Sequence, residues 1–239
     1  TVFDNNYTLN TVDICPVGAL LDKSFLFQQR VWFLTRTPSI DGLTASGDNI
    51  VVQHNDGRVH RITPRTNMDV NTWWITDEVR SSWKHVHSDA RLHLPAVKGL
   101  PAFGHHESNA AWHAGLTRAT GLVAEAVNAK RGTALVVSPM LSCEDAFELA
   151  GWMLAMNPGA LLAVGPVPFR GDDKTFKGGF RMYAEKAPNA RGVRRVLDAL
   201  AARSPGARVV DFAGFQAAVR NREVGAAVIT GNYPSDWVT

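Results

Sequence analysis

The sequence predicts an α/β protein in which a small β-rich subdomain precedes a doubly wound parallel α/β domain. In the N-terminal half, an Asp-Gly pair stands between two β-rich segments, which is a strong hairpin signal. From about residue 105 onward, short continuous apolar segments alternate with longer amphipathic ones, as expected for buried parallel strands joined by helices. Of the 239 residues, 45% are hydrophobic and 20% are charged, which suits a packed core. The predicted domains cover residues 1–30, 31–104 and 105–239.

The N-terminal segment is polar and contains one clear turn signal. Pro16 and Gly18 follow Cys15 closely, and this spacing predicts a turn that leads into a short helix. At the far end of this half, residues 76–104 mix charged residues with His and Pro. That mixture predicts a short helix followed by a connecting loop.

Residues 31–75 are predicted to form β structure. The apolar segment 31–34 is the first candidate strand. Further strands are predicted at 49–54 and 58–62. The Asp-Gly pair between them predicts a type I′ turn, because both residues tolerate the positive φ that this turn requires.

The second half is predicted to alternate helices and strands. Lys130 and Arg131 followed by Gly132 form a helix-stop signal. Ser142, with Asp145 three residues later, resembles a capping box at the start of a helix. Helices are predicted at 107–130, 143–156, 190–202 and 214–221, and strands at 133–138, 160–165, 208–211 and 225–230.

Composition excludes several classes of protein. Lys and Arg number 25 against 22 Asp and Glu, a net charge of +3 that is too balanced for a dedicated nucleic-acid binder. No apolar segment is as long as a membrane span. Cys15 and Cys143 are the two cysteines, which excludes a disulfide scaffold and a complete cysteine-only metal site within these residues. Because the chain starts at Thr1 and no signal-like segment follows, we expect a piece or a processed product of a longer protein.

Cys15-Pro16 matches the fourth-ligand half of a ferredoxin-type iron–sulfur motif, although a structural cysteine in a turn is the alternative. The surrounding residues 10–20 and many later segments also favour an iron–sulfur protein. These later segments are 30–34, 48–50, 61–65, 70–71, 74–80, 85–92, 137–139, 165–168 and 184–193. Together they resemble the large iron–sulfur (G-type) subunit of NADH–quinone oxidoreductase, respiratory complex I, over most of the chain.

The resemblance implies a role in electron transfer. It implies that Cys15 is the last of four thiolates that hold a 4Fe–4S cluster, the other three lying upstream in a ferredoxin-like segment whose tail is residues 1–30. The whole subunit would pass electrons from a flavin subunit towards quinone, beside other flavin and iron–sulfur subunits. It would lie on the cytoplasmic side of the bacterial inner membrane or the mitochondrial matrix side, without membrane insertion. The present segment would be mainly scaffold and inactive in isolation, with no catalytic residues.

A second cluster can be tested against the sequence. Many bacterial relatives carry the pattern C-x2-C-x3-C followed by a cysteine before Asp-Glu, and this pattern places Asp41, Thr44, Asp48 and Thr76 at the ligand positions. Oxygen ligands do not assemble an iron–sulfur cluster, so we expect this cluster to be lost, as in mitochondrial-type members. A cation site at Asp41 and Asp48 is conceivable, but acids on a surface loop are favoured. The resemblance also relates this subdomain to the Fe–S domain of molybdopterin oxidoreductases.

Two further groups of side chains could carry chemistry. A zinc site is one hypothesis for the histidines, and loop or interface polar groups are the favoured alternative. Cys143 at a predicted helix start could be a nucleophile, but a small packing residue is favoured because no His partner lies in the flanking segment. The histidines in question are His85, His87, His93, His105, His106 and His113.

The predicted α/β domain lacks a dinucleotide-binding signature. No Gly-rich loop follows the strands at 133–138 and 160–165, so we expect that this domain does not bind NADH itself. Residues 170–195 are basic, which favours a solvated surface or a docking site for a protein partner. Two alternatives to the complex I assignment stay open. One is the equivalent subunit of an NAD-reducing hydrogenase or formate dehydrogenase, and the other is a cluster-free structural protein.

Overall fold

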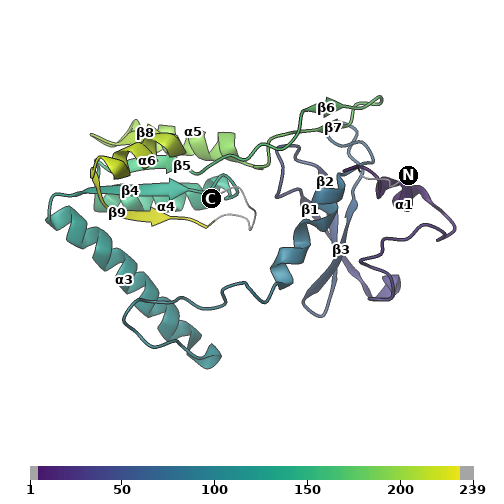
Figure 1. Cartoon of the computed structure of the whole chain (residues 1–239), viewed down its shortest axis with the longest axis horizontal. Coiled ribbons are helices and arrows are strands. Elements are labelled where there is room, and N and C mark those ends of the chain that lie inside the picture. Colours follow the sequence, from purple (N-terminus) through teal and green to yellow (C-terminus); the bar gives the residue numbers. More distant parts are fainter. Residues whose placement is uncertain (1–4, 232–239) are drawn as a thin grey trace. The chain divides into compact units, whose positions relative to one another are not determined.

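The computed structural model describes residues 5–231, apart from the side chain of His105, and divides the chain into two compact units (Figure 1). Unit 1 comprises the described residues up to Arg91 together with Pro168–Pro188. Unit 2 comprises Leu92–Val167 and the described residues from Asn189 onward. Residues 168–188 therefore pack with unit 1, although the sequence analysis placed them in the α/β domain. The three predicted domain boundaries stay predictions.

Unit 1 is built on an antiparallel sheet in the order β1-β2-β3, formed by β1 (Thr35–Ile40), β2 (Asn49–Asn55) and β3 (Arg58–Pro64). The predicted hairpin is confirmed, with positive φ at both Asp56 (48°) and Gly57 (72°). Its core is a small cluster of buried side chains that also includes residues from α2 (Asp77–Ser81) and the segment before it. These side chains belong to Ile50, Ile62, Ile75 and Val79.

The prediction of a strand at 31–34 is wrong. Val31–Phe33 form a short 3-10 turn, η1, and the strand begins only at Thr35. Trp32 and Phe33 are exposed rather than buried against a neighbouring strand. An apolar sequence alone therefore did not determine the strand start here.

The turn at Cys15 has a helix before it instead of after it. Helix α1 (Asn10–Ile14) ends at Cys15, and the following residues form turns and bends. Gly18 has a φ of 68°, which lies outside the right-handed helical region and explains why the predicted second helix does not form. The short helix and loop predicted at 76–104 are confirmed by α2 (Asp77–Ser81), η2 (Ser82–His87) and the irregular segment that follows.

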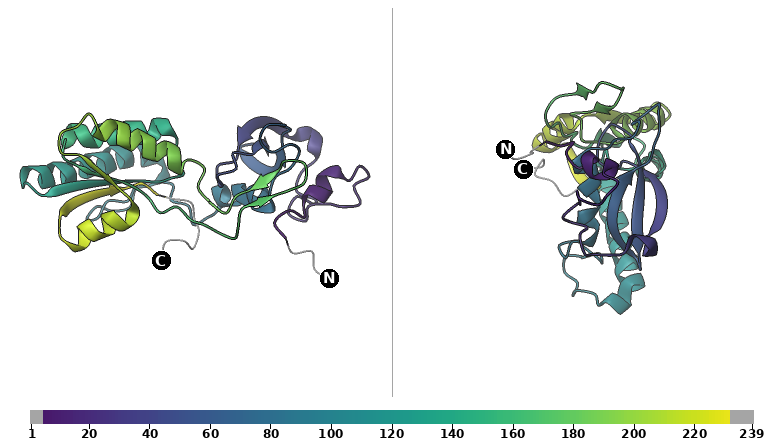
Figure 2. Two further views of the ribbon diagram at one scale, coloured as in Figure 1. Left: turned by 90° about the horizontal axis from the view of Figure 1, so that it is seen from above. Right: turned by 90° about the vertical axis from the view of Figure 1, so that its right-hand side faces the viewer.

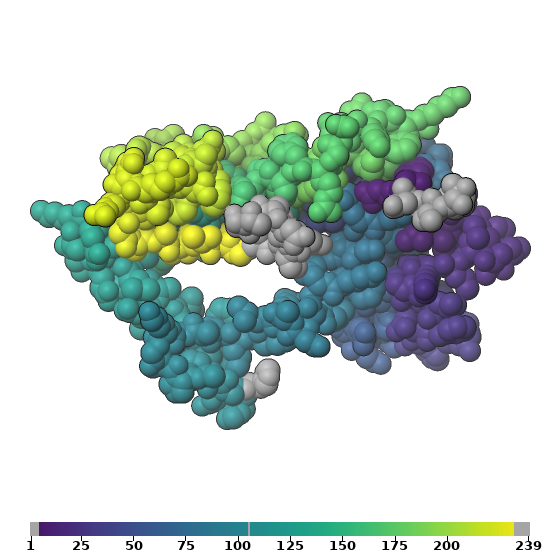
Figure 3. Space-filling view, in the orientation of Figure 1, coloured from purple at the N-terminus to yellow at the C-terminus, as the bar shows by residue number. Residues whose placement is uncertain are grey.

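Residues 168–188 contain a small hairpin. Its strands, β6 (Lys174–Thr175) and β7 (Arg181–Met182), are too short to leave a periodic pattern. Figure 3 shows the tip of this hairpin, in green, projecting from the surface. Phe176, the residue directly after β6, stacks on Tyr7, with 4.7 Å between ring centroids. This contact holds the hairpin against the N-terminal residues of unit 1.

Unit 2 is a doubly wound α/β sheet, as predicted. Its four strands are parallel in the order β8-β5-β4-β9, and helices cover both faces (Figure 2). A turn η3 (His105–Glu107) comes first, followed by the elements α3 (Ser108–Asn128), β4 (Gly132–Val137), α4 (Cys143–Met156), β5 (Leu161–Val164), α5 (Ala190–Ala201), β8 (Arg208–Val210), α6 (Phe212–Arg220) and β9 (Val224–Ile229).

The two faces of this sheet have separate cores. On one face, Val123 of α3, Met153 of α4 and Leu197 of α5 pack against the strands. On the other face, Phe215 and Ala218 of α6 do so. None of the helices within residues 5–231 is long and apolar enough to span a membrane.

The predicted cap of α4 is present and supports a stability prediction. The Ser142 hydroxyl accepts the backbone N–H of Asp145 at 3.0 Å. Ser142→Ala is expected to lower the free energy of unfolding of unit 2 by about 1 kcal/mol, because one helix donor loses its partner. Urea unfolding measures the loss, with Ser204→Ala as the control. Equal effects of the two variants would contradict the role of the cap.

Candidate functional site

The Cys15 thiol lies in a turn whose backbone amides surround it. The N–H groups of Leu20 and Val17 lower the pKa of the thiol most. Burial opposes them, and the N–H groups of Ala19 and Gly18 lower the pKa further. Partial positive charges therefore converge on one sulfur atom. Such an environment stabilises a thiolate, which is the form that binds metals.

Helix α1, which ends at Cys15, is fastened to unit 1 by polar contacts. The Asn10 side chain is buried and exchanges two hydrogen bonds with the backbone of Ile75, at 2.8 and 3.3 Å. The guanidinium of Arg80 donates to the Asp13 carboxylate at 2.6 Å, and only 5% of the Arg80 side chain is exposed. Arg80 and Asn10 thus fix the start of the Cys15 turn to α2.

The sequence analysis included Arg80 in a matching segment but gave it no role. The ion pair joins residues 67 positions apart, and neither a motif nor a periodic pattern links such distant positions. No sequence signal could have identified this anchor before the fold was known.

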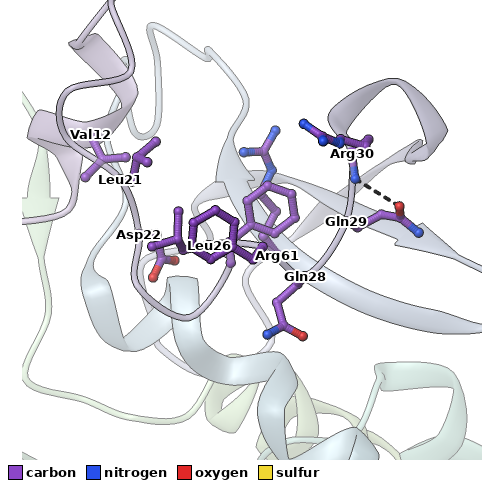
Figure 4. A pocket seen from close by; sticks show the side chains of 10 residues that line it. Val12, Leu21, Asp22, Leu26, Gln28, Gln29, Arg30 and Arg61 are labelled. Atoms are coloured by element: carbon purple, nitrogen blue, oxygen red, sulfur yellow. Dashed lines mark hydrogen bonds between the residues drawn. The ribbon is translucent and has the colours of Figure 1, made fainter.

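Beside α1 lies an open hollow of about 560 Å³ (Figure 4). Val12 and Leu21 lie side by side in its lining, and Arg61 also lines it, with its guanidinium 4.4 Å from the ring centroid of Phe25. The hollow is bordered by α1, which ends at Cys15, and by the segment that follows Cys15. It therefore lies near the cysteine.

Several apolar side chains in the segment that follows Cys15 are exposed. Val17 is 79% exposed, Phe27 96% and Trp32 73%. Exposed apolar side chains of this size are available for contact with another chain segment or protein.

The four residues at the second cluster pattern are buried. Asp41, Thr44, Asp48 and Thr76 are each 1–3% exposed. The prediction that Asp41 and Asp48 are surface loop acids is therefore wrong. The reason is tertiary: the loop between β1 and β2 packs against residues 168–188, and the Ala45 N–H donates to the Glu185 carbonyl at 3.1 Å.

The two buried acids have different surroundings. The Asp41 carboxylate accepts the backbone N–H groups of Leu43 (2.8 Å) and Thr44 (3.1 Å), as well as the Thr44 hydroxyl. Burial nevertheless raises the pKa of Asp41 to about 6. For Asp48, burial first and the nearby Asp41 second raise the pKa to about 8. Thr76 instead caps α2, its hydroxyl accepting the Val79 N–H.

The histidines do not form a joint site in the described part of the chain. The ring of His87 accepts the Val59 N–H at 2.9 Å, which is a structural role in unit 1. His93, His106 and His113 belong to unit 2. Among residues 5–231, with the His105 side chain outside the description, no group of three or more His, Cys, Asp or Glu could hold a metal ion.

Cys143 lies on the first turn of α4, as predicted, but its side chain is exposed. Its sulfur lies 3.5 Å from the Asn189 side-chain amide at the start of α5. The prediction of a small apolar packing residue is therefore wrong, because Cys143 is exposed and its sulfur contacts a polar side chain.

Comparison with known proteins assigns part of unit 1 to an iron–sulfur domain family. Residues 34–84 match the family described as NADH-ubiquinone oxidoreductase NDSU1/NuoG-like, 4Fe-4S domain. The resemblance found in the sequence is therefore confirmed for the N-terminal part of the chain.

The chain is similar to large subunits of this enzyme. It is 40% identical over 97 residues to the NADH-ubiquinone oxidoreductase 75 kDa subunit of Reclinomonas americana, which is 41% of this chain and 14% of the relative. It is 42% identical over 90 residues to the mitochondrial NADH dehydrogenase (ubiquinone) iron-sulfur protein 1 of Solanum tuberosum, 38% of this chain and 12% of the relative. The 78 kDa subunit of Neurospora crassa is 39% identical over 114 residues, 48% and 15% of the respective lengths. Each match covers a small part of the relative.

The residues present fit an iron–sulfur cluster at one place and not at the other. At Cys15, a thiol that faces several backbone N–H groups suits a cluster ligand, because such hydrogen bonds to sulfur are a feature of these sites. The matched segment 34–84 contains no cysteine, and its four candidate positions carry oxygen side chains. Those residues do not fit a cluster.

Proposed function

We propose that this chain is part of the iron–sulfur electron-transfer subunit of an NADH:quinone oxidoreductase, and that Cys15 is one of four thiolate ligands of a 4Fe–4S cluster. The observation that carries the proposal is the Cys15 turn, in which several backbone N–H groups face one sulfur. Since a cluster of this type needs about four thiolates, the other three come from outside residues 1–239. When bound, the cluster supplies a one-electron carrier between a flavin subunit and quinone.

The chain's own residues have three tasks in this proposal. The amides of 17–20 donate to the Cys15 sulfur and so stabilise the reduced form of the site, which carries the greater negative charge. Asn10 and Arg80 hold α1, and with it Cys15, in one position. The exposed Val17, Phe27 and Trp32 become covered by the segment or subunit that brings the other ligands, which removes water from the surroundings.

The remainder of the chain is proposed to be scaffold. The doubly wound sheet of unit 2 has no Gly-rich phosphate loop, so it braces neighbouring subunits instead of binding NADH. The kinship of the small β-rich subdomain with the Fe–S domain of molybdopterin oxidoreductases is part of the same proposal. We place the protein on the cytoplasmic face of a bacterial inner membrane or the matrix face of the mitochondrial one.

The proposal predicts the effect of removing one thiol. Cys15→Ala in the natural reading frame is expected to abolish NADH-dependent quinone reduction by membranes, because the cluster loses a ligand while the rest of the fold persists. Cys143→Ala is the matched control and is expected to retain the activity. Normal activity of the Cys15→Ala membranes would contradict the proposal and favour a cluster-free structural domain.

A further inference from the structure

The loop between β1 and β2 is closed by two acids that face each other. The Asp41 N–H donates to the Asp48 carbonyl at 2.8 Å, and this pair continues the register in which Ile40 lies opposite Asn49. Directly opposed residues of an antiparallel pair project on the same face, with about 5 Å between Cβ atoms. Asp41 is 3% exposed and Asp48 is 1% exposed, so both carboxyl groups are largely shielded from bulk water.

Protein donors serve these two acids unequally. Asp41 accepts three hydrogen bonds from its own turn, at Leu43 and Thr44. The Oδ2 atom of Asp48 is buried and has no hydrogen-bond partner among the described residues. A charged Asp48 would therefore be both unsolvated and opposite a like charge, which is strongly unfavourable.

The surrounding charged groups do not relieve this conflict. From α2, Glu78 faces Asp41 with a further negative charge. From residues 168–188, Lys186 is engaged with Glu78 at 2.5 Å, and the Glu185 carbonyl accepts the Ala45 N–H. From the end of β3, Arg65 donates to the Asn49 side chain. None of the ion pairs described within residues 5–231 includes Asp41 or Asp48.

We propose that Asp41 and Asp48 share one proton at neutral pH, with Asp48 as the neutral acid and Asp41 as the carboxylate, and that this proton latches the 41–48 loop onto residues 168–188. The neutral Asp48 can donate its O–H to Asp41, which satisfies the buried oxygen and removes the repulsion. A bound cation is the less suitable alternative. Three protein donors already occupy the Asp41 oxygens, and the nearby Glu78 is paired with Lys186. The described residues contain no group of three or more His, Cys, Asp or Glu that could hold a metal ion.

The latch gives stability a defined dependence on pH. In the unfolded chain both acids titrate near the ordinary value of 3.8, whereas in the folded chain the pKa values rise to about 6 for Asp41 and about 8 for Asp48. The folded state therefore holds more protons than the unfolded state between about pH 4 and 8. Stability falls as the pH rises through that window and levels off above it. Loss of the proton would loosen the loop and its contact at Ala45.

The test compares thermal unfolding of this chain from pH 5 to 9 with that of Asp48→Asn. Asparagine is neutral and can donate to Asp41, so this variant is expected to raise the melting temperature at pH 8.5 by about 5 °C and to flatten most of the decline with pH. Asp56→Asn, on the exposed hairpin turn, is the matched control and is expected to behave as the wild type. A pH dependence of Asp48→Asn equal to that of the wild type would overturn the proposal.

A second measurement stands even if Asp48→Asn does not fold. The infrared spectrum of the wild-type chain in heavy water is expected to contain the carbonyl band of a protonated carboxyl group at pH 7, and to lose it as the pH rises through about 8. The protection factor of the Ala45 amide, which corrects its exchange rate for the intrinsic rise with pH, is expected to fall over the same range. Absence of the band would show that no shared proton exists. The same conclusion would follow if Mg²⁺, Ca²⁺ or K⁺ stabilised the wild type at constant ionic strength, because a cation would then occupy the place of the proton.

Discussion

Replacing Arg80 with alanine is expected to lower the free energy of unfolding of unit 1 by about 3 kcal/mol and to release the segment that ends at Cys15. Arg80 is 5% exposed and its guanidinium reaches Asp13 at 2.6 Å, the Ile62 carbonyl at 3.5 Å and Asn10 Oδ1 at 3.4 Å. Its removal leaves Asp13 without a partner in a half-buried position, where water compensates only in part. The loss is therefore larger than for a surface ion pair.

Two further variants, a conservative one at the same position and a control elsewhere, test the Arg80 prediction. Arg80→Lys keeps the charge but cannot span Asp13 and the Ile62 carbonyl with one ammonium group, so an intermediate loss is expected. Arg58→Ala, at an exposed position of β3, is the control and is expected to change the stability little. Urea unfolding gives the free energies, and hydrogen exchange at residues 10–14 reports release of α1. Equal stabilities of Arg80→Ala and Arg58→Ala would contradict the anchoring role.

Asn71→Ala is expected to have a comparable effect, about 3 kcal/mol, because one side chain contacts four buried or partly buried backbone groups. Asn71 has no exposed surface, and its Oδ1 accepts the Asn49 N–H at 3.1 Å. Its Nδ2 donates to the carbonyls of Asn49, Arg65 and Trp74 at 3.0–3.3 Å. Asn71 therefore joins the start of β2, the residue that follows β3 and the segment that precedes α2.

The Asn71 prediction is checked by urea unfolding, followed by tryptophan fluorescence. Asn71→Asp is expected to be as destabilising as Asn71→Ala, because a carboxylate cannot donate to the three carbonyls. Asn55→Ala is the control, since the side chain of Asn55 makes only an exposed 3.4 Å contact with Asp56. A loss for Asn71→Ala no larger than that for Asn55→Ala would mean that water replaces the amide without cost.

The architecture of unit 2 could be predicted because its signals are local. The continuous apolar segment that became β4, the Ser142 cap and the helix-stop signal at 130–132 each act within a few residues. The hairpin turn at Asp56 and Gly57 could be predicted for the same reason, since its φ values depend only on the residues in the turn. Local signals were insufficient at 31–34, where apolar residues are exposed.

The candidate site was only half predictable. Cys15 stands out because a Cys-Pro pair is a local motif, but the arrangement that holds it depends on Arg80, which is far away in the sequence. The burial of Asp41 and Asp48 was missed for a similar reason. The segment that covers their loop is residues 168–188, and no sequence pattern near the two acids predicts this contact.

The most direct test of the central claim is a count of iron and acid-labile sulfide in the polypeptide expressed anaerobically from the complete reading frame. The account predicts that Cys15→Ala lowers both counts by about four per polypeptide and removes one 4Fe–4S spectrum, while Cys143→Ala leaves both unchanged. A Cys15→Ala protein with its full complement of iron and sulfide would contradict the assignment of Cys15 as a ligand. A colourless, iron-free wild-type product would contradict the electron-transfer role altogether.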